Sequence, residues 1–559
     1  MKRYFQKSKK QLAAYTLSAL FMAAIGVSQA FLLQYISETA MTGASQGIPL
    51  VLVLVLVAGY LVLDTASDFA YGYSLRCACT KIAMDLRNDL LRRIQKCPIE
   101  EKEQKGDGFY LSMLNDQVGE VEEDYVGGLL QVLFQIFSLF FALAAATAIQ
   151  PAMTLVVLVL CVLPLVVPKL LQKKLESTRR EAANTKSSYV NLLSELMAGF
   201  STLKIFGRSA EADSYHRQAN AATRKSILYS RKWGRVSMSL SYGMGLLVVL
   251  SAWVFGLIFA ASGYITVPQM IALTSLMTMV AGPFQIISEL YASILSGGAI
   301  AGDLVAFVDS NPGETDTYKT ESREINQIAL SHARVVKGGR AILEDVSFRA
   351  GRGEKICLIG PSGSGKSTLL RTIAGIVSLD EGQLLVDGQD LSQKPGLTHR
   401  ELRYLSQDTV LFSASIGRNV SLFRKMPEKP LRQALTQAGL ETWFRGMGGN
   451  LDAPMEKSSV NLSGGEQKRF DFARILCEGG QILLFDEPTA GLDAANARNV
   501  MAQIAAMENG ILVVATHDLE AENMRRFDRI YLMGEGKVVF SGTAEEVLAS
   551  SQFQALEQG

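Results

Sequence analysis

The sequence lacks a cysteine framework and lacks an excess of either charge. Its six cysteines are Cys77, Cys79, Cys97, Cys161, Cys357 and Cys477. They show neither the paired spacing of a disulfide-rich domain nor the spacing of zinc ligands, and the lone C-x-C at 77–79 has no further ligands beside it. Lys and Arg number 55 against 54 Asp and Glu, a formal net charge of +1. Nothing in the charge therefore favours a nucleic-acid partner.

Charged residues are also scarce, at 19 %, where soluble domains carry about 25 %. The chain has 559 residues, which is too long for one core, so two or more domains are expected. Long apolar runs fill the chain up to about residue 300, and the remainder is typical of a soluble α/β domain. The first apolar segment is long and has no small-residue cleavage site, so no signal peptide is expected.

Six apolar stretches are long enough to cross a membrane, which takes roughly 20 residues per helix. We expect spans at about 12–36, 48–70, 126–149, 152–171, 237–261 and 267–291. The second contains IPLVLVLVLVAGYLVL, which has no charged residue. One such run fits a buried helix of a soluble protein, but six indicate an all-α transmembrane domain.

Basic residues are missing from some connections and abundant in others. The loop 37–47 and the connection 262–266 contain no Lys or Arg, whereas residues 1–10, 71–107 and 169–235 are rich in them. The positive-inside rule then places both termini and the following soluble domain in the cytoplasm of a multi-pass protein of the cell (inner) membrane. The two long basic segments are expected to be helices that extend into the cytoplasm.

A few polar residues interrupt the spans and are candidates for contact with a transported substrate. These are Asp64, Gln131 and Glu289. Acids inside a membrane are costly and often mark a pathway or a binding site. Counting about 1.5 Å per residue from Pro49 puts Asp64 about 22 Å along its helix, so the alternative is that water reaches it from the cytoplasmic end.

The stretch EKICLIGPSGSGKSTLLRTIAGI (354–376) has an apolar strand, a glycine-rich loop and a helix. Its spacing Gly360-x4-Gly365-Lys366-Ser367 is that of a P-loop. Glycines allow backbone N–H groups to converge on phosphate oxygens, and the helix N-terminus adds a favourable dipole. Lys366 can reach the outer phosphates and Ser367 can ligate Mg²⁺.

Two further strands end in polar residues. QILLFDEPTAGLD (481–493) places Asp486 and Glu487 after an apolar strand, and ILVVATH (511–517) ends in His517. One carboxylate can organise the Mg²⁺ shell and the next can polarise an attacking water. His517 is a candidate contact for the γ-phosphate.

The stretch NLSGGEQKRF (461–470) is a polar turn before a helix, a weak signal taken alone. In the order GPSGSGKST, Gln407, LSGGEQ, LLFDEP, Asp493 and His517, these motifs resemble the ATPase of ABC transporters, and LSGGEQ is particular to that superfamily. The membrane half resembles the exporter-type (type IV) half-transporter in GDGFYLSMLNDQVGEVEED (106–124), LLSELMAGFSTLKIFGRSAEA (192–212) and QDTVLFSASIGRNV (407–420).

This resemblance implies a multidomain protein: a six-helix transmembrane domain at 1–310, a linker at 311–324 and an α/β P-loop ATPase at 325–559. It implies ATP and Mg²⁺ as ligands, with Asp486, Ser367 and Gln407 at the metal, and Glu487, Gln407 and His517 in hydrolysis. The nucleotide contacts that it implies are Gly360, Ser362, Gly363, Gly365, Lys366, Ser367, Thr368, Ser463, Gly464, Gly465 and Asp493.

In the resembling family, Ser463 and Gly465 contact the ATP bound by the opposite subunit, so the chain is expected to work as a dimer in the lipid membrane. EPTAGLD and LSGGEQ also resemble the heterodimeric thiol and haem exporters of cytochrome bd assembly, which favours a second, different half-transporter as partner, with a homodimer as the alternative. The expected function is ATP-driven, alternating-access export of a small molecule or peptide. Import of a siderophore or metal complex and an ATP-regulated channel or sensor are the alternatives.

One expected feature is absent. From Lys319 to Ser347 there is no Phe, Tyr or Trp, although an aromatic ring of the resembling family stacks on adenine near Val336 or Lys337. The phosphate and hydrolysis positions are all present, so we predict an ATP site with weaker or less selective binding of the base. Arg334, Lys337 or Arg340 are candidates to lie over the base instead, and an aromatic ring of the partner chain is the alternative. Ser459, where the family has glycine, is a second departure.

Overall fold

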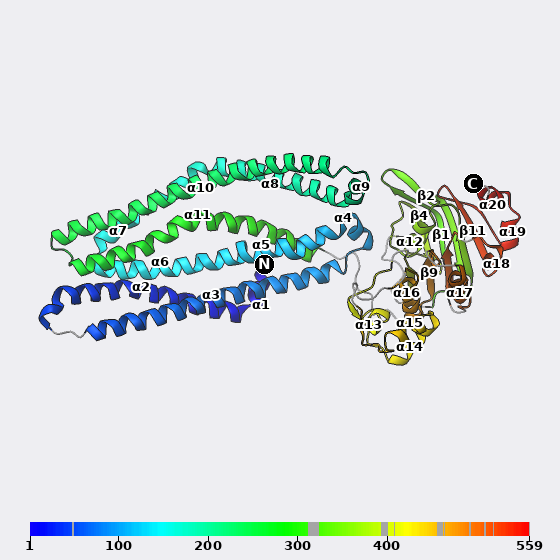
Figure 1. Cartoon of the computed structure of the whole chain (residues 1–559), viewed down its shortest axis with the longest axis horizontal. Coiled ribbons are helices and arrows are strands. Elements are labelled where there is room, and N and C mark those ends of the chain that lie inside the picture. The colour runs from blue at the N-terminus through cyan, green and yellow to red at the C-terminus, as the bar shows by residue number, and fades with distance from the viewer. Residues whose placement is uncertain are drawn as a thin grey trace. The chain divides into compact units, whose positions relative to one another are not determined.

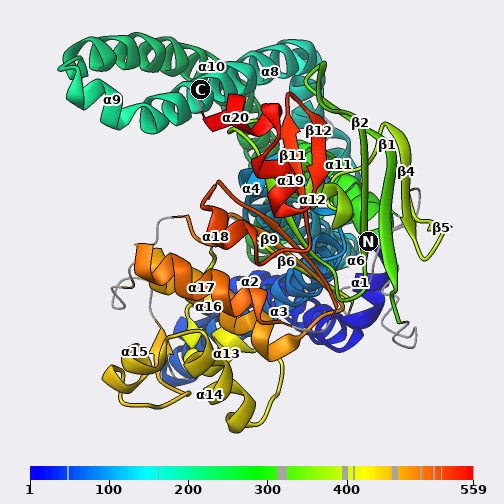
Figure 2. The same ribbon diagram turned by 90° about the vertical axis from the view of Figure 1, so that its right-hand side faces the viewer.

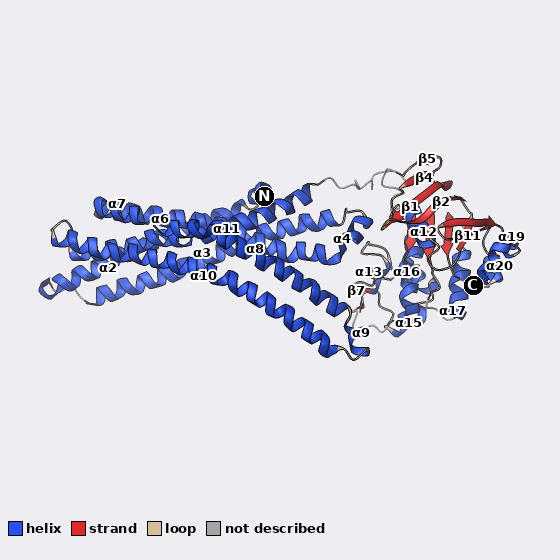
Figure 3. Ribbon diagram, turned by 90° about the horizontal axis from the view of Figure 1, so that it is seen from above, coloured by secondary structure: helices blue, strands red, loops and turns tan. Residues whose placement is uncertain are grey.

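The computed structural model describes residues 1–46, 50–161, 163–310, 324–392, 401–406, 409–455, 462, 464–490, 494–507, 510–517 and 519–557. The chain divides into two compact units. The first consists of Met1–Gln95 and Asp107–Ser310, and the second of Lys96–Gly106 and Asn311–Gly559. In Figure 3 the first unit is drawn in helices throughout, and the strands belong to the second.

The first unit is a set of long helices that run side by side (Figure 1). Its elements are α1 Lys2–Lys7, α2 Lys9–Gln46, α3 Leu50–Ile94, α4 Ile99–Ser112 (which begins in the second unit), the π-helical η1 Met113–Gln117, α5 Val118–Glu120, the π-helical η2 Val121–Gly127, α6 Gly128–Ile149, α7 Pro151–Leu160, α8 Leu163–Ala198, α9 Phe200–Ile205, α10 Ser209–Ala261 and α11 Val267–Asp309. A helix satisfies every backbone hydrogen bond within the segment, as the hydrocarbon layer requires.

Among the described residues, five stretches of helix are long and apolar enough to cross a membrane. They are Lys9–Met41, Val51–Ile94, Ile99–Ile149, Ser209–Ala261 and Val267–Phe284. The expected fourth span, 152–171, is divided between the short apolar helix α7 and the beginning of α8. Residue 162, between them, lies outside the described residues. The helical transmembrane domain is therefore confirmed, whereas the exact number of six spans is not.

Small residues bring several of these helices close together. A Cβ on Gly256 of α10 would lie 2.8 Å from Met270 Cγ of α11, and one on Gly128 of α6 would lie 2.7 Å from Ile294 Cγ1 of α11. Close approach at glycine is a common way of packing helices in membranes, where apolar side chains gain nothing by leaving lipid. α11 thus packs against both α6 and α10 through glycine contacts.

The second unit contains twelve strands among its described residues: β1 Gln327–Lys337, β2 Arg340–Gly351, β3 Lys355–Ile359, β4 Glu381–Val386, β5 Gln389–Asp390, β6 Leu402–Leu405, β7 Ala414–Ser415, β8 Pro454–Met455, β9 Ile482–Asp486, β10 Ile511–Ala515, β11 Arg529–Gly534 and β12 Lys537–Gly542. Its helices are α12 Lys366–Ile373, α13 Ile416–Val420, α14 Glu428–Gln437, α15 Glu441–Gly446, α16 Gly464–Glu478, α17 Ala494–Ala505, α18 Ala521–Met524, α19 Ala544–Leu548 and α20 Ser551–Glu557. Figure 2 shows α16 and α17 on one side of the strands β6, β9 and β11.

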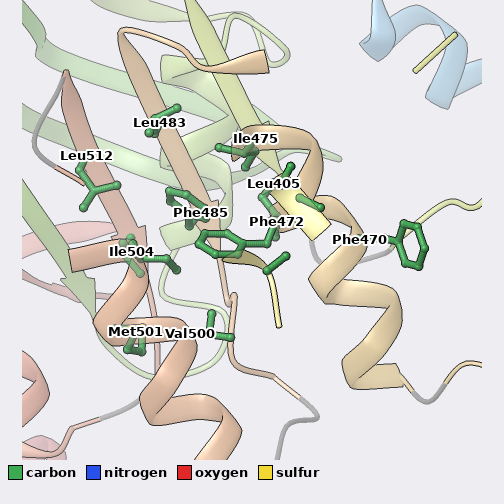
Figure 4. Close-up of a cluster of buried hydrophobic side chains, with 14 of the residues drawn as sticks. Leu405, Phe470, Phe472, Ile475, Leu483, Phe485, Val500, Met501, Ile504 and Leu512 are labelled. Atoms are coloured by element: carbon green, nitrogen blue, oxygen red, sulfur yellow. The ribbon is translucent and has the colours of Figure 1, made fainter. Parts of the chain in front are cut away.

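The central sheet has the strand order β12-β11-β3-β10-β9-β6. All of its pairings are parallel except that of β11 with β12. Alternate residues of β9 and β10 enter different cores: Leu483, Phe485 and Leu512 join one buried cluster, and their neighbours join the other. Figure 4 shows the first cluster, with Phe485 and Leu483 facing Phe472 and Ile475 of α16. A sheet buried on both faces explains the nearly unbroken apolar strands.

A second sheet is antiparallel, in the order β2-β1-β4-β5. The segment Lys96–Gly106 belongs to this second unit although it lies between α3 and the later membrane helices in the chain. The predicted boundary at 310 and the linker 311–324 stay predictions, because residues 311–323 lie outside the described part of the chain.

Candidate functional site

The carboxyl ends of three neighbouring parallel strands form the candidate site. β10 lies between β3 and β9, with Ala515 opposite Leu358 on one side and opposite Asp486 on the other. Parallel strands end at the same edge of the sheet, which is where open α/β sheets bind ligands. The P-loop after β3, the acidic pair that ends β9 and His517 after β10 therefore share one edge.

Two P-loop glycines have no room for a side chain. Gly360 has φ 153°, and a Cβ on it would lie 2.3 Å from the carbonyl oxygen of Met533. Gly365 has φ 101°, and its Cβ would lie 2.8 Å from Leu343 Cδ2. The loop is thus held closely against β11 and β2 and delivers Lys366 to the first position of α12.

Lys366 folds back into the loop that precedes it. Its Nζ donates hydrogen bonds to the carbonyl oxygens of Gly360, at 2.8 Å, and Pro361, at 3.0 Å. The residue is buried, and burial lowers the pKa of its ammonium group, while the charges of Glu487 and Asp486 act in the opposite direction. A positive charge is therefore kept inside the loop, near backbone N–H groups that suit an anion.

The other predicted phosphate contacts flank this lysine. Ser362 and Gly363 are exposed in the loop, and Ser367 and Thr368 lie in the first turn of α12. The Thr368 carbonyl accepts a hydrogen bond from Thr372 Oγ1 at 2.8 Å. The loop and the helix N-terminus are thus arranged as the P-loop spacing predicts, and the contacts of these residues with phosphate stay predictions.

Asp486 is held by a hydroxyl on each of its oxygens. Ser367 Oγ donates to Oδ1 at 2.9 Å, and the Tyr404 hydroxyl donates to Oδ2 at 3.0 Å. Asp486 is buried, and this burial raises the pKa of its carboxyl group, against the effect of the two hydroxyls. Burial, followed by the charge of Asp486, also raises the pKa of the Tyr404 phenol, which therefore remains a donor.

Glu487 and His517 form a second pair at the same edge. His517 Nε2 lies 2.5 Å from Glu487 Oε1. Glu487 has a left-handed backbone, with φ 50°, which is costly for a side-chain-bearing residue and persists where the surroundings enforce it. The N–H of Glu487 donates to the carbonyl oxygen of Ala515, and the carbonyl oxygen of Glu487 accepts from Lys468 Nζ of α16 at 3.0 Å.

Three predicted site residues lie outside the described residues: Gln407, Ser463 and Asp493. Gly464 and Gly465 begin α16. In the first unit, Asp64 is half-buried and faces the hydroxyl of Tyr60 at 3.4 Å, whereas Gln131 is exposed on α6. Glu289 is part of α11, but its side chain is not among those described. Contact of Asp64, Gln131 and Glu289 with a substrate stays a prediction.

Within the segment without aromatics, β1 and β2 are joined by a tight hairpin turn. β1 and β2 pair up to Lys337 and Arg340, and Gly338 and Gly339 between them have φ 56° and 79°. Positive φ at both central residues is the requirement of the type I′ two-residue hairpin turn. Arg334 forms an ion pair with Glu381 at 2.5 Å, which leaves Lys337 and Arg340, both exposed, as the better candidates for contact with a base.

The sequence analysis missed three parts of the chain that contact the residues of the candidate site or its P-loop helix. Tyr404 and Lys468 reach the acidic pair from elsewhere in the chain, and the segment Lys96–Gly106 reaches the P-loop helix. In that segment, Glu103 forms an ion pair with Arg371 of α12, and Glu100 accepts from Ser378 Oγ at 2.9 Å. These glutamates precede the stretch 106–124 that resembles the coupling segment, and no motif identified them.

Comparison with known proteins gives the same assignment for both halves. The family model of the ABC transporter transmembrane region matches residues 12–284, and the ABC transporter model matches residues 343–490. ATP-dependent lipid A-core flippases are similar over most of their length. That of Methylobacillus flagellatus is 24 % identical, over 88 % of this chain and 84 % of its own. That of Bordetella pertussis is 25 % identical, over 99 % of this chain and 90 % of its own.

A solved structure has the same fold. The structure of a bacterial Atm1-family ABC exporter with ATP bound matches with a TM-score of 0.82 and 18 % identity, over 98 % of each chain. The two family models cover most of the helical first unit, and the P-loop and the acidic pair of the second. The chain therefore belongs to the ABC transporters, as a multi-pass membrane half-transporter whose own ATPase domain couples ATP hydrolysis to transport.

Proposed function

We propose that the chain is one half of a dimeric exporter that hydrolyses Mg²⁺-bound ATP in the cytoplasm and moves a lipid outward across the inner membrane. The observation that carries this is the sheet edge where the P-loop, Asp486, Glu487 and His517 come together. The chain has a single P-loop and a single LSGGEQ stretch. If Ser463 and Gly465 complete the site of a second subunit, one chain alone has two incomplete sites.

The residues present fit ATP. A side chain at Gly360 or Gly365 would collide with neighbouring atoms, so the loop is kept bare for backbone N–H groups to face phosphate. The buried Lys366 ammonium is poised to exchange its two carbonyl contacts for phosphate oxygens. These features support binding of a nucleoside triphosphate by its phosphates.

The donor set also fits magnesium. Ser367 and Asp486 offer hard oxygen atoms, and Mg²⁺ is usually held by one or two protein ligands together with substrate phosphates. When bound, Mg²⁺ neutralises the charge that develops on the phosphates.

The chain's own residues would then perform hydrolysis. Glu487 is proposed as the general base that takes a proton from the attacking water through its carboxylate. His517, within 2.5 Å of that carboxylate, holds it in place and can contact the γ-phosphate. Lys366 retains the phosphates while the bond breaks.

The named activity of the relatives supports a lipid substrate and outward transport. Several curated relatives at 24–26 % identity are lipid A-core flippases, and each match covers more than four fifths of both chains. A lipid is also chemically suited to a helical domain whose described surface carries many exposed large apolar side chains. The loops without Lys or Arg would face outward and the ATPase inward.

Reconstitution into liposomes tests the proposal. Purified protein, with any half-transporter that co-purifies, is reconstituted with a fluorescent lipid, and leaflet location is read by quenching with membrane-impermeant dithionite. We expect ATP with Mg²⁺ to transfer lipid away from the leaflet that faces the ATPase domains, and no transfer with Glu487→Gln. ATP-dependent movement of a soluble solute without lipid transfer would refute the lipid substrate, and ion current without turnover would favour a channel.

A further inference from the structure

Tyr404 is the residue at the site that no motif includes. It lies on β6, which pairs in parallel with β9 so that Tyr404 is opposite Leu484 and Leu405 is opposite Phe485. Asp486 is two residues beyond Leu484, so its side chain is on the same face of the sheet and diagonal to Tyr404. A diagonal separation of about 7–8 Å between neighbouring strands is within reach of a tyrosine.

The two parts of this side chain have different neighbours. The ring packs against the buried cluster that contains Leu484 and Leu358, a role that phenylalanine would fill equally well. The hydroxyl donates to Asp486 Oδ2 at 3.0 Å. Packing therefore explains the ring, and only the contact with Asp486 accounts for the hydroxyl.

The hydroxyl has a directional effect on the carboxylate. The terminal torsion of an aspartate is broad, so a carboxylate with one partner can rotate. With Tyr404 on Oδ2, the other oxygen is turned toward Ser367 Oγ, 2.9 Å away. Hydrogen bonds from outside the coordination sphere orient metal-binding carboxylates in this way, and losing one typically weakens metal affinity 10- to 100-fold.

We propose that Tyr404 is a positioning residue that orients Asp486 toward Ser367 for metal binding. The inference rests on the proposed function, in which Ser367 and Asp486 hold Mg²⁺. Tyr404 itself touches neither nucleotide nor metal in this proposal. Its contribution is to fix which oxygen of a buried carboxylate faces the metal.

The test uses the full-length protein in detergent, with Mn²⁺ as a spectroscopic substitute for Mg²⁺ and a non-hydrolysable ATP analogue. Mn²⁺ affinity is measured by electron paramagnetic resonance for wild type and for Tyr404→Phe. We expect affinity to fall about 10- to 100-fold. Binding of the analogue in EDTA should stay within twofold of wild type. The Mg²⁺ concentration that gives half-maximal ATPase activity should rise by a similar factor.

Tyr531→Phe is the control. Tyr531 lies on β11 of the same unit, and its part-buried hydroxyl donates to the Arg349 carbonyl oxygen at 3.0 Å and accepts from the Arg349 N–H at 3.2 Å. Tyr531→Phe should leave Mn²⁺ affinity unchanged. Equal Mn²⁺ affinities for wild type and both variants would overturn the proposal. Tyr404→His, which keeps a ring with an N–H donor, should regain part of the affinity. Tyr404→His is also the variant to measure if Tyr404→Phe does not fold. Wild-type Mn²⁺ affinity in Tyr404→His, together with a structure of that variant in which the introduced histidine does not contact Asp486, would overturn the proposal.

The variant Asp486→Asn distinguishes an error in the proposed metal site from an error in the proposed role of Tyr404. If Asp486→Asn binds Mn²⁺ as wild type does, the proposed metal site is wrong and the role of Tyr404 falls with it. If Asp486→Asn loses Mn²⁺ but Tyr404→Phe does not, the metal site stands and only the positioning role is overturned.

Discussion

Glu487 combines a catalytic candidate with a strained backbone. A left-handed conformation at a residue other than glycine costs on the order of 1–3 kcal/mol. In this chain three contacts hold it: its N–H to Ala515, its carbonyl to Lys468 and its carboxylate to His517. These contacts maintain the strained backbone and fix the carboxylate at the P-loop edge of the sheet.

Replacing this carboxylate with an amide should separate binding from hydrolysis. Glu487→Gln keeps the size of the side chain but cannot accept the proton from water, so we expect the ATPase rate to fall about 10²- to 10⁴-fold. Affinity for ATP should be preserved. Steady-state ATPase assays and equilibrium nucleotide binding measure the two quantities, with the exposed Glu522→Gln as control. An unchanged rate would show that another group is the base.

The hairpin at Gly338 and Gly339 allows the missing adenine contact to be restored. Lys337 is exposed beside this turn, so Lys337→Tyr can add a ring without disturbing a core. Stacking of a base on an aromatic ring contributes about 1–3 kcal/mol elsewhere, so we expect ATP affinity to rise about tenfold. Lys337→Leu removes the same ammonium and adds no ring. Equal affinities for the Tyr and Leu variants, measured by calorimetry, would mean that the base is already held by another group.

For individual site residues, the sequence predicted those whose role follows from neighbouring positions in the chain. The P-loop, the acidic pair and His517 each come directly at the end of an apolar strand, so each could be identified from the sequence, whereas their shared edge depends on the strand order. Tyr404 could not be identified, because it is 82 positions from Asp486 and meets it only through the pairing of β6 with β9. Lys468 was missed for the same reason, since its helix must first pack on the sheet.

Among the helices, α4 has a break that divides the two units. Gly106 has φ 74° and ψ 160°, inside a segment that is otherwise helical, and the unit boundary falls between Gly106 and Asp107. That conformation is nearly exclusive to glycine. The apolar runs predicted the long helices correctly, but this bend and the division of the fourth span depend on backbone geometry that hydropathy does not report.

The neighbouring glycines of α4 offer a direct comparison. Neither Gly106 nor Gly108 has an atom within 4 Å of the place where a Cβ would lie, so an added methyl group meets no steric obstacle at either. Gly106→Ala must adopt the disfavoured conformation at a cost of about 1–3 kcal/mol, whereas Gly108→Ala should gain up to about 1 kcal/mol of helix propensity. We expect Gly106→Ala alone to lower the melting temperature of the purified transporter. A similar decrease in Gly108→Ala would show that the backbone conformation is not the cause.

The whole molecule is expected to have one fixed orientation in the membrane. Ser262 and Ser209 are exposed at opposite ends of α10, a helix of 53 residues that is long enough to span the membrane and extend well beyond it. In a background without the native cysteines, Ser262→Cys in intact cells should react with a membrane-impermeant maleimide. Ser209→Cys should react only after the cells are permeabilised. The reverse labelling pattern would invert the proposed topology.

The position of residues 96–106 in the chain has a practical consequence for exchanging ATPase domains between transporters. This short segment is encoded between membrane helices, yet it forms one compact unit with the ATPase through Glu103 on Arg371 and Glu100 on Ser378. An ATPase cut out at residue 325 would leave those two partners facing solvent. A chimera that exchanges ATPase domains between half-transporters must therefore carry its own copy of this segment, or supply matching side chains in the recipient.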